Sequence, residues 1–264
     1  MDEDQRIDLS NNSVADYYNT VAETWDSTPG AGRQNERFSR QLRASLMALL
    51  TDDAGSAVAL ELGVGTGPYV GLTAPLFGKL IALDVSSEML AVLAQRISKL
   101  GLTNVELLRQ DACDLPDVQA ASVDVVYSIG VLETVEDYDR LFMATDRVLK
   151  PGGLVAGITS NGRCPWYWFR DRFDGGQRYC RSRNLPTAAR IKAVLRRSGF
   201  DPPEVSCWGA VPAGMEDHRV LEWMLATAES MVRPTPLSRY LGALSFRARK
   251  LGGRDHSNPH LTAF

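Results

Sequence analysis

Short apolar segments alternate with longer segments of helical periodicity between residues 57 and 160. The apolar segments read AVALEL, LIALDV, VELLRQD, VDVVYSI and LVAGIT, and helical patterns follow Gly67 and cover residues 87–100 and 138–149. Short strands separated by helices predict a parallel sheet with helices on both faces. The unbroken apolar character of VDVVYSI is typical of a central strand that is buried on both sides.

Less regular segments flank this alternation and predict the domain organisation. Residues 1–50 contain two stretches with apolar residues three and four apart, separated by a break at 29–32, and predict a helical N-terminal cap. Residues 161–185, rich in arginine and aromatic residues, predict a lid within a main domain that spans 51–251. Residues 252–264 have no periodicity and predict a disordered tail.

Composition and charge exclude several classes of protein. Of 264 residues, 44% are hydrophobic and 23% are charged, as in ordinary soluble domains, and the formal charge of -3 lacks the basic excess of nucleic-acid binders. The charge is uneven, because residues 1–159 carry 12 basic and 23 acidic side chains whereas residues 160–264 carry 17 and 9. No apolar run approaches the roughly 18 residues of a membrane span. We therefore expect no nucleic-acid partner and no membrane span.

Cysteine usage and the first residues favour a cytoplasmic protein without a metal centre. The four cysteines, at positions 113, 164, 180 and 207, form no CxxC pair and have no histidine at metal-ligand spacing. We interpret them as reduced thiols. The first residues, MDEDQ, are acidic where a signal peptide would be basic and then apolar.

The segment ELGVGTG, residues 61–67, lies where the first predicted strand meets the following helix. Its glycines permit a tight turn and let a ligand approach bare backbone. Asp84 ends the second predicted strand, 21 residues after Gly63, where a carboxylate can accept hydrogen bonds from ribose hydroxyls. These features predict a site for a nucleoside cofactor. They do not choose the cofactor, because the dinucleotide fingerprint GxGxxG shares this geometry, although here the third glycine comes one position early and Pro68 takes its place.

Five segments in order, YYNTVAETWD, ELGVGTG, ALDVSSEML, QDACDLP and SIGVLETVEDYDRLFMATDRVLKPGG, span residues 17–153, about half the chain. In this order they resemble the class I S-adenosylmethionine-dependent methyltransferases. The resemblance implies an α/β fold, a Rossmann-like three-layer sandwich with a mostly parallel seven-stranded sheet of order 3-2-1-4-5-7-6, in which the last strand is antiparallel. It implies S-adenosylmethionine as cofactor, S-adenosylhomocysteine as product, and no metal.

The resemblance also implies which residues bind the cofactor. The loop glycines would approach its methionine part, Asp84 would hold the ribose, Asp111 would accept from the adenine amino group, and Tyr18 would close over the site. The full implied set comprises Tyr18, Glu61, Gly63, Gly65, Gly67, Asp84, Ser86, Met89, Asp111, Ala112, Ser128 and Ile129.

Transfer of a methyl group from a sulfonium is an in-line displacement, in which orientation of the reactants supplies much of the barrier reduction. An amine or hydroxyl acceptor also needs a group that takes its proton. The family layout makes Glu133 and Asp16 candidate bases near the cofactor, and His218 a candidate at a helix start folded over the pocket. Many relatives carry a histidine where this chain has Thr134, so a base at that position is absent. Catalysis by orientation alone is the alternative.

Residues 162–184 combine six arginines with six aromatic residues and follow the fifth predicted strand. We expect this lid to contact a small, largely apolar acceptor through Trp166, Arg170 and Arg178, together with Tyr17, with an arginine binding an anionic group. The alternative is a solvated surface over a small aromatic core.

The sequence leaves other functions open. A protein of the same fold could bind the cofactor without catalysis, and a nicotinamide oxidoreductase shares the glycine loop. Protein or tRNA acceptors also stay open, as do the atom methylated (oxygen, nitrogen or carbon) and the choice between monomer and homodimer.

Overall fold

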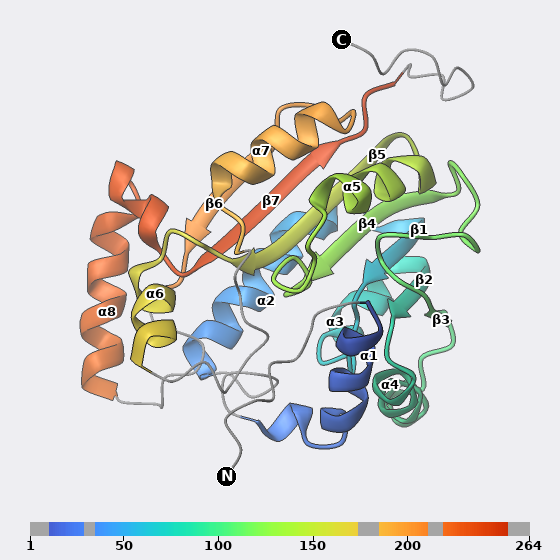
Figure 1. The fold of residues 1–264 in the computed structure, drawn as a ribbon, viewed down its shortest axis with the longest axis horizontal. Coiled ribbons are helices and arrows are strands. Elements are labelled where there is room, and N and C mark those ends of the chain that lie inside the picture. Colours follow the sequence, from blue (N-terminus) through green and yellow to red (C-terminus); the bar gives the residue numbers. More distant parts are fainter. Residues whose placement is uncertain (1–10, 29–34, 174–184, 211–218, 253–264) are drawn as a thin grey trace.

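A seven-stranded sheet organises the chain in the computed structural model, which describes residues 11–28, 35–173, 185–210 and 219–252 (Figure 1). The strand order is β3-β2-β1-β4-β5-β7-β6. The strands are β1 (Gly55–Leu62), β2 (Phe77–Asp84), β3 (Val105–Arg109), β4 (Val123–Ile129), β5 (Leu149–Ser160), β6 (Glu204–Trp208) and β7 (Ala243–Arg249). Strands β1 to β5 pair in parallel, and β7 is antiparallel to both β5 and β6. The predicted fold class, strand order and antiparallel last strand are confirmed.

Helices cover both faces of this sheet (Figure 1). The α-helices are α1 (Asn11–Val21), α2 (Glu36–Leu50), α3 (Val70–Thr73), α4 (Ser87–Leu100), α5 (Tyr138–Val148), α6 (Pro165–Phe173), α7 (Ala188–Arg197) and α8 (Arg219–Val232). Short 3-10 helices are η1 (Trp25–Ser27), η2 (Thr51–Asp53), η3 (Ala74–Leu76) and η4 (Pro236–Tyr240). Within the described residues, no helix combines the length and apolar character that a bilayer crossing requires.

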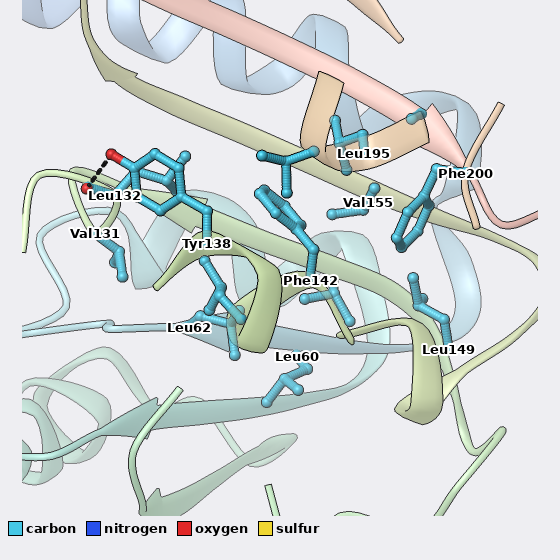
Figure 2. Packing of buried hydrophobic residues seen from close by; sticks show 14 of the residues in the cluster. Leu60, Leu62, Val131, Leu132, Tyr138, Phe142, Leu149, Val155, Leu195 and Phe200 are labelled. Atoms are coloured by element: carbon cyan, nitrogen blue, oxygen red, sulfur yellow. Dashed lines mark hydrogen bonds between the residues drawn. The ribbon is translucent and has the colours of Figure 1, made fainter. Parts of the chain in front are cut away.

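Two hydrophobic clusters fill the spaces between the layers. Figure 2 shows part of the first cluster, in which Tyr138 and Phe142 of α5 and Leu195 of α7 pack on one face of the sheet. The second cluster packs α2 and α4 on the other face. Strand β4 contributes to both clusters, with Val126 in the first and Tyr127 in the second. This placement confirms a central strand buried on both sides, and it explains the absence of polar alternation in its sequence.

Local sequence signals set the ends of the helices. Ser86 begins α4, because its hydroxyl accepts from the Met89 N–H (3.1 Å), and Gly101 ends it in a left-handed conformation with φ +66°. The helix expected after Gly67 is a single turn, α3. It cannot continue because Pro75, in the following η3, has no N–H and its ring would clash with a preceding carbonyl.

Parts of the predicted domain organisation lie outside the described residues. Of the predicted lid, 161–173 is described and contains α6, whereas 174–184 is not described. Of the predicted tail, 253–264 is likewise outside the described part. The N-terminal cap corresponds to α1, η1 and α2 in the described ranges.

Lys250, directly after β7, joins the last strand to the end of α5. Its ammonium donates to the carbonyl oxygens of Asp146 (2.6 Å) and Leu149 (3.0 Å) and lies 3.6 Å from the Asp146 carboxylate, and both Lys250 and Asp146 are buried. A cation at a helix C-terminus compensates the unpaired carbonyl groups and the helix dipole. The lysine therefore stabilises the junction of β7 and α5.

We predict that Lys250→Met lowers the free energy of unfolding by about 3 kcal/mol, because it leaves a buried carboxylate and two carbonyl groups without their cation. Lys79→Met is the matched control, since Lys79 pairs with Glu106 at the exposed surface and its loss should cost below about 1 kcal/mol. Chemical denaturation of both variants measures the difference. Equal losses in the two variants would contradict the role assigned to Lys250.

Candidate functional site

A cavity of about 360 Å³ lies where the carboxyl ends of β1, β2 and β4 meet the N-terminal cap. Open parallel sheets bind ligands at this edge. The lining comprises Val14, Tyr18, Trp25, Glu61, Gly63, Val64, Gly65, Pro68, Tyr69, Leu83, Asp84, Val85, Met89, Gln110, Asp111, Ala112, Cys113, Ile129, Gly130, Val131, Thr134, Val135, Glu136, Asp137 and Arg140. The cavity therefore brings together nine of the twelve residues implied to bind the cofactor.

The three loop glycines differ in what constrains them. All three have positive φ, between +58° and +70°. A Cβ on Gly63 would lie 2.4 Å from Val131, and a Cβ on Gly67 would lie 2.3 Å from Leu93 in the core, whereas a Cβ on Gly65 would meet no atom within 4 Å. Gly63 and Gly65 line the cavity, and Gly67 does not. Gly67 is thus needed for packing against α4, and Gly65 is the loop glycine with open space beside it.

Asp84 holds the glycine loop in place from the neighbouring strand. Its Oδ2 accepts from the Gly65 N–H (2.8 Å) and its Oδ1 accepts from the Ser86 N–H (2.9 Å). The residue is buried, and burial raises the pKa of its carboxyl, although these backbone N–H groups oppose the shift. One carboxylate therefore fixes the ends of both β1 and β2. Asp84 also lines the cavity, and each of its oxygens has a further lone pair that can accept a hydrogen bond from a ligand.

Glu61 and Tyr127 form a buried polar pair beside the loop. The Tyr127 hydroxyl donates to Glu61 Oε2 (2.7 Å), and Glu61 lines the cavity. Burial raises the pKa of Glu61 from 4.5 to about 7, the Tyr127 hydrogen bond lowers it in part, and the charge of Asp84 raises it further. Glu61 therefore titrates near neutral pH.

The N-terminal cap closes one side of the cavity with two aromatic rings. Tyr18 and Trp25 line it, with their ring centroids 5.4 Å apart in an edge-on arrangement. Asp26 accepts from the Thr66 hydroxyl of the glycine loop (2.6 Å) and pairs with Arg96 of α4. Together with the hydrogen bond from Ser86 Oγ to Asn19 (2.7 Å), these contacts fix the cap on the loops below.

Two of the implied cofactor residues have structural positions away from the cavity lining. Ser86 is the N-cap of α4, and Ser128 is buried within β4. Met89, Asp111, Ala112 and Ile129 do line the cavity. The Asp111 carboxylate also accepts from the Cys113 N–H (2.8 Å), which orients it at the end of β3.

The loop between β4 and α5 and the first turn of α5 supply lining residues that the sequence interpretation missed. Thr134, Val135, Glu136, Asp137 and Arg140 all line the cavity. Asp137 is also the N-cap of α5, accepting from the Arg140 N–H (3.0 Å). An aspartate before a helical pattern was the available signal, since the segment VEDYDR follows a central strand at the ligand-binding edge.

Of the candidate bases, the two in the described ranges, Glu133 and Asp16, are not among the residues that line the cavity. Glu133 Oε1 accepts from the Ser160 N–H (2.6 Å), and burial raises the pKa of Glu133. Its Oε2 is buried without a hydrogen-bond partner in the described part of the chain. Asp16 is exposed on α1. His218 and Arg178 are outside the described residues.

The other two residues expected in the lid belong to α6, and of these Trp166 is not among the described residues that line the cavity. Trp166 stacks with Phe169, with ring centroids 6.3 Å apart, and is 39% exposed. Arg170 is in the same helix, and its side chain is not among those described. The rings of Tyr17 and Tyr18 meet edge-on with their centroids 5.2 Å apart, and Tyr17 does not line the cavity.

The cavity is acidic. Among the described residues, five carboxyl groups line it, from Glu61, Asp84, Asp111, Glu136 and Asp137, against one guanidinium, from Arg140. The Cys113 thiol also lines it, and burial raises the pKa of this thiol to about 12, so that it stays neutral. Such a wall favours a cationic ligand over a polyanionic one. In the described ranges, no group of three or more histidine, cysteine or acidic residues is arranged to hold a metal ion.

We predict that Gly67→Ala costs roughly 3 kcal/mol of folding stability and Gly65→Ala about 1 kcal/mol. Both alanines would be strained at positive φ, but only the Gly67 substitution also forces the buried Leu93 to move. Thermal and denaturant unfolding of the two variants gives the comparison. A Gly65→Ala variant as unstable as Gly67→Ala would show that open space beside Gly65 is absent in solution.

Comparison with known proteins shows similarity to methyltransferases over the part of the chain that carries this site. A family model described as a methyltransferase domain matches residues 60–157. The chain is 33% identical over 156 residues to a malonyl-[acyl-carrier protein] O-methyltransferase of Marinomonas sp. (58% of this chain, 56% of the relative). It is 28% identical over 199 residues to a demethylmenaquinone methyltransferase of Oceanobacillus iheyensis (66% and 81%). The match thus spans little more than half the length of the first relative.

Among solved structures, the [4+2]-cyclase SpnF superposes with a TM-score of 0.65 at 20% identity, covering 92% of this chain and 97% of that one. At this identity the likeness shows the fold alone. The methyltransferase-domain match, the named relatives and the confirmed sheet order agree with the five sequence segments. Residues 60–157 match a methyltransferase domain, and the chain is similar to the class I S-adenosylmethionine-dependent methyltransferases in sequence and in strand order.

Proposed function

We propose that the chain binds S-adenosylmethionine in the acidic cavity and transfers its methyl group to a small-molecule acceptor. The observation that carries this proposal is the cavity wall itself, in which Asp84 and Glu61 flank a glycine loop at the carboxyl edge of the sheet. S-adenosylmethionine carries a sulfonium and an ammonium group, and five carboxyl groups suit that charge.

In this proposal each part of the cavity wall has a distinct task. Asp84, already oriented by two backbone N–H groups, would accept from the ribose hydroxyls. Glu61 would face the ammonium end, and Asp111 with Met89 would contact the adenine. Tyr18, with its neighbour Trp25, would cover the cofactor and exclude water from the reacting groups.

When bound, the cofactor supplies a methyl group on a positively charged sulfur, ready for in-line displacement. The chain contributes orientation, because α1 and the loop after β4 both line the cavity and limit the positions of an acceptor. Glu133 is the described carboxyl with a buried, unpartnered oxygen and a raised pKa. Glu133 directly precedes the lining residue Thr134 without lining the cavity itself, so it is the proposed proton acceptor only for an acceptor molecule that extends beyond the cavity, and orientation alone suffices if the methylated atom carries no proton.

The apolar and cationic residues of the cavity lining indicate the chemical class of the methyl acceptor. Val135, Ile129 and Val131 give an apolar wall, and Arg140 gives the one cation in the described lining, although it also lies 3.7 Å from Asp114. A small, largely apolar acceptor with an anionic group fits this combination. The relatives are named for malonyl-[acyl-carrier protein] and for demethylmenaquinone, so relatives of this chain use different acceptors. The same fold is found in a protein named a cyclase.

A nicotinamide oxidoreductase fits the same site less well. A dinucleotide places its pyrophosphate at the N-terminus of the helix that follows the glycine loop. Here that helix is the four-residue α3, and the loop N–H of Gly65 is already bonded to Asp84. Anionic phosphates would also meet the carboxyl groups of the wall. A second alternative is a non-catalytic protein that binds S-adenosylmethionine. Only a measurement of turnover distinguishes such a protein from an enzyme.

Calorimetric titration with S-adenosylmethionine, S-adenosylhomocysteine and NADH tests the proposal. We predict micromolar binding of the two adenosyl ligands and none of NADH, with binding weakened at least tenfold in Asp84→Ala, because that variant loses both the ribose contact and the loop anchor. Glu106→Ala, an exposed carboxylate on β3, is the control and should bind as the wild type does. Binding of NADH alone would overturn the proposal, and turnover of methyl-labelled cofactor with an acceptor panel separates an enzyme from a binding protein.

Glu61 should make cofactor binding depend on pH. Because its pKa is about 7 in the free protein, a cationic ligand beside it favours the carboxylate and releases a proton. We predict that affinity for S-adenosylmethionine rises between about pH 6 and pH 8 and that Glu61→Gln flattens this rise and weakens binding at pH 8. Calorimetry in buffers of different ionisation enthalpy measures the proton release.

The same substitution should stabilise the ligand-free protein at high pH. The folded-state pKa of Glu61 lies above its ordinary value of 4.5, so the folded protein binds more protons than the unfolded chain between pH 4.5 and 7, and stability falls as pH rises through this window. Above pH 7 the ionised Glu61 lowers the free energy of unfolding by at most about 3 kcal/mol, and Glu61→Gln removes this loss. A variant that is less stable than the wild type at pH 8 would contradict this account.

A further inference from the structure

Large apolar side chains are exposed on α6, α8 and η4, the elements that follow the ligand-binding strands. We call them the α6–α8 face, which consists of Trp166, Trp168, Phe169, Trp223, Met224, Met231, Leu237 and Tyr240. Trp168 is 71% exposed, and Trp223 and Met231 are each 69% exposed. Isolated exposed apolar residues are normal in proteins, but eight large ones on three connected elements mark an interaction surface.

These three elements are joined at the end of β5. The Asn161 amide, directly after β5, donates to the carbonyl oxygens of Arg239 (2.9 Å) and Leu241 (2.7 Å) at the end of η4. Helix α6 begins four residues after Asn161, and α8 precedes η4 by three residues. Figure 1 shows α6 and α8 at the end of the molecule where β5 stops. Because β5 is parallel to β4, this is also the sheet edge that carries the cavity.

Helix α8 is held firmly on the rest of the protein, although its apolar side chains are exposed. Its Glu229 is buried and accepts from the N–H groups of Gly209 and Ala210, each at 3.1 Å, and from the Gln41 amide at 2.8 Å. Trp223 and Met231 lie eight residues apart, two turns along the opposite side of the helix. The inner side of α8 is thus fixed by hydrogen bonds, and its outer side is apolar and exposed.

The charge around this face is positive. In the sequence, residues 163–173 and 219–240 contain six arginines (163, 170, 172, 219, 233 and 239) against three acidic residues (171, 222 and 229), and the buried Glu229 pairs with Arg233 (3.2 Å). Arg163 and Arg239 are exposed. The face therefore combines tryptophan, other large apolar residues and arginine, the combination that favours the boundary between water and an anionic lipid surface.

We propose that the α6–α8 face binds peripherally to the surface of an anionic phospholipid bilayer. A second copy of the chain is the other simple occupant, but a two-fold dimer would place this positive surface against itself. An anionic bilayer instead matches the charge and takes up the exposed rings. The inference does not rest on the proposed methyl transfer, because it uses no residue of the cavity lining.

Vesicle co-sedimentation of the full chain tests this proposal. We expect binding to vesicles of phosphatidylcholine with phosphatidylglycerol, weak binding to phosphatidylcholine alone, and loss of binding as salt is raised. A blue shift of tryptophan fluorescence should accompany binding. The double variant Arg163→Gln/Arg239→Gln should weaken it by about fivefold for each arginine, and Trp223→Gln/Met231→Gln should weaken it at least tenfold.

Met143→Gln is the matched control, because Met143 is 65% exposed on α5, outside the α6–α8 face, and this variant should bind vesicles as the wild type does. Circular dichroism and the unfolding midpoint of each variant verify folding. Absence of binding to anionic vesicles, or equal binding by all variants, would overturn the proposal. So would a dimer, detected by light scattering without lipid, that Trp223→Gln/Met231→Gln dissociates.

Discussion

The hydrogen bonds of the Asp84 carboxylate connect the parts on which the site depends. By accepting from Gly65 and from Ser86, this carboxylate ties the turn after β1 to the turn after β2. Ser86 in turn begins α4 and donates to Asn19 of the cap. A single buried acidic group therefore links two strand ends, one helix start and the cap segment. Its burial is unfavourable for the charged form, and the backbone N–H groups offset that cost.

Much of the fold was predictable because its signals are local. Strand β4 reads as an apolar run since both of its faces are covered, and α4 carries a serine at its start and a glycine after its end. The strand order was a different kind of prediction. Periodicity implies a parallel sheet, but the insertion of β7 between β5 and β6 came from the resemblance to a family, because no local pattern encodes which strands become neighbours.

The site was most predictable at the carboxyl ends of the strands. Glu61 and Asp84 are among the last residues of β1 and β2, Asp111 comes two residues after β3, and all three line the cavity. The wall formed by Val135, Glu136 and Arg140 depends on the path of a loop, which propensity does not determine. Gly67 illustrates the converse case, in which a motif residue serves packing against Leu93 rather than the cavity. Trp166 of α6 is not among the described lining residues, since that helix begins beyond the end of β5.

The position of β7 has a consequence for how the molecule is assembled. As the chain leaves the ribosome, β5 and β6 are complete long before residues 243–249 exist, and in the finished sheet these two strands pair with β7 and not with each other. That half of the sheet can close only after residues 243–249 have been synthesised, and the Lys250 contact with the end of α5 forms later still. The parallel half, β1 to β4, has no such delay. Between the two events the nascent protein exposes the edges of β5 and β6, so this interval is when it most needs protection from aggregation.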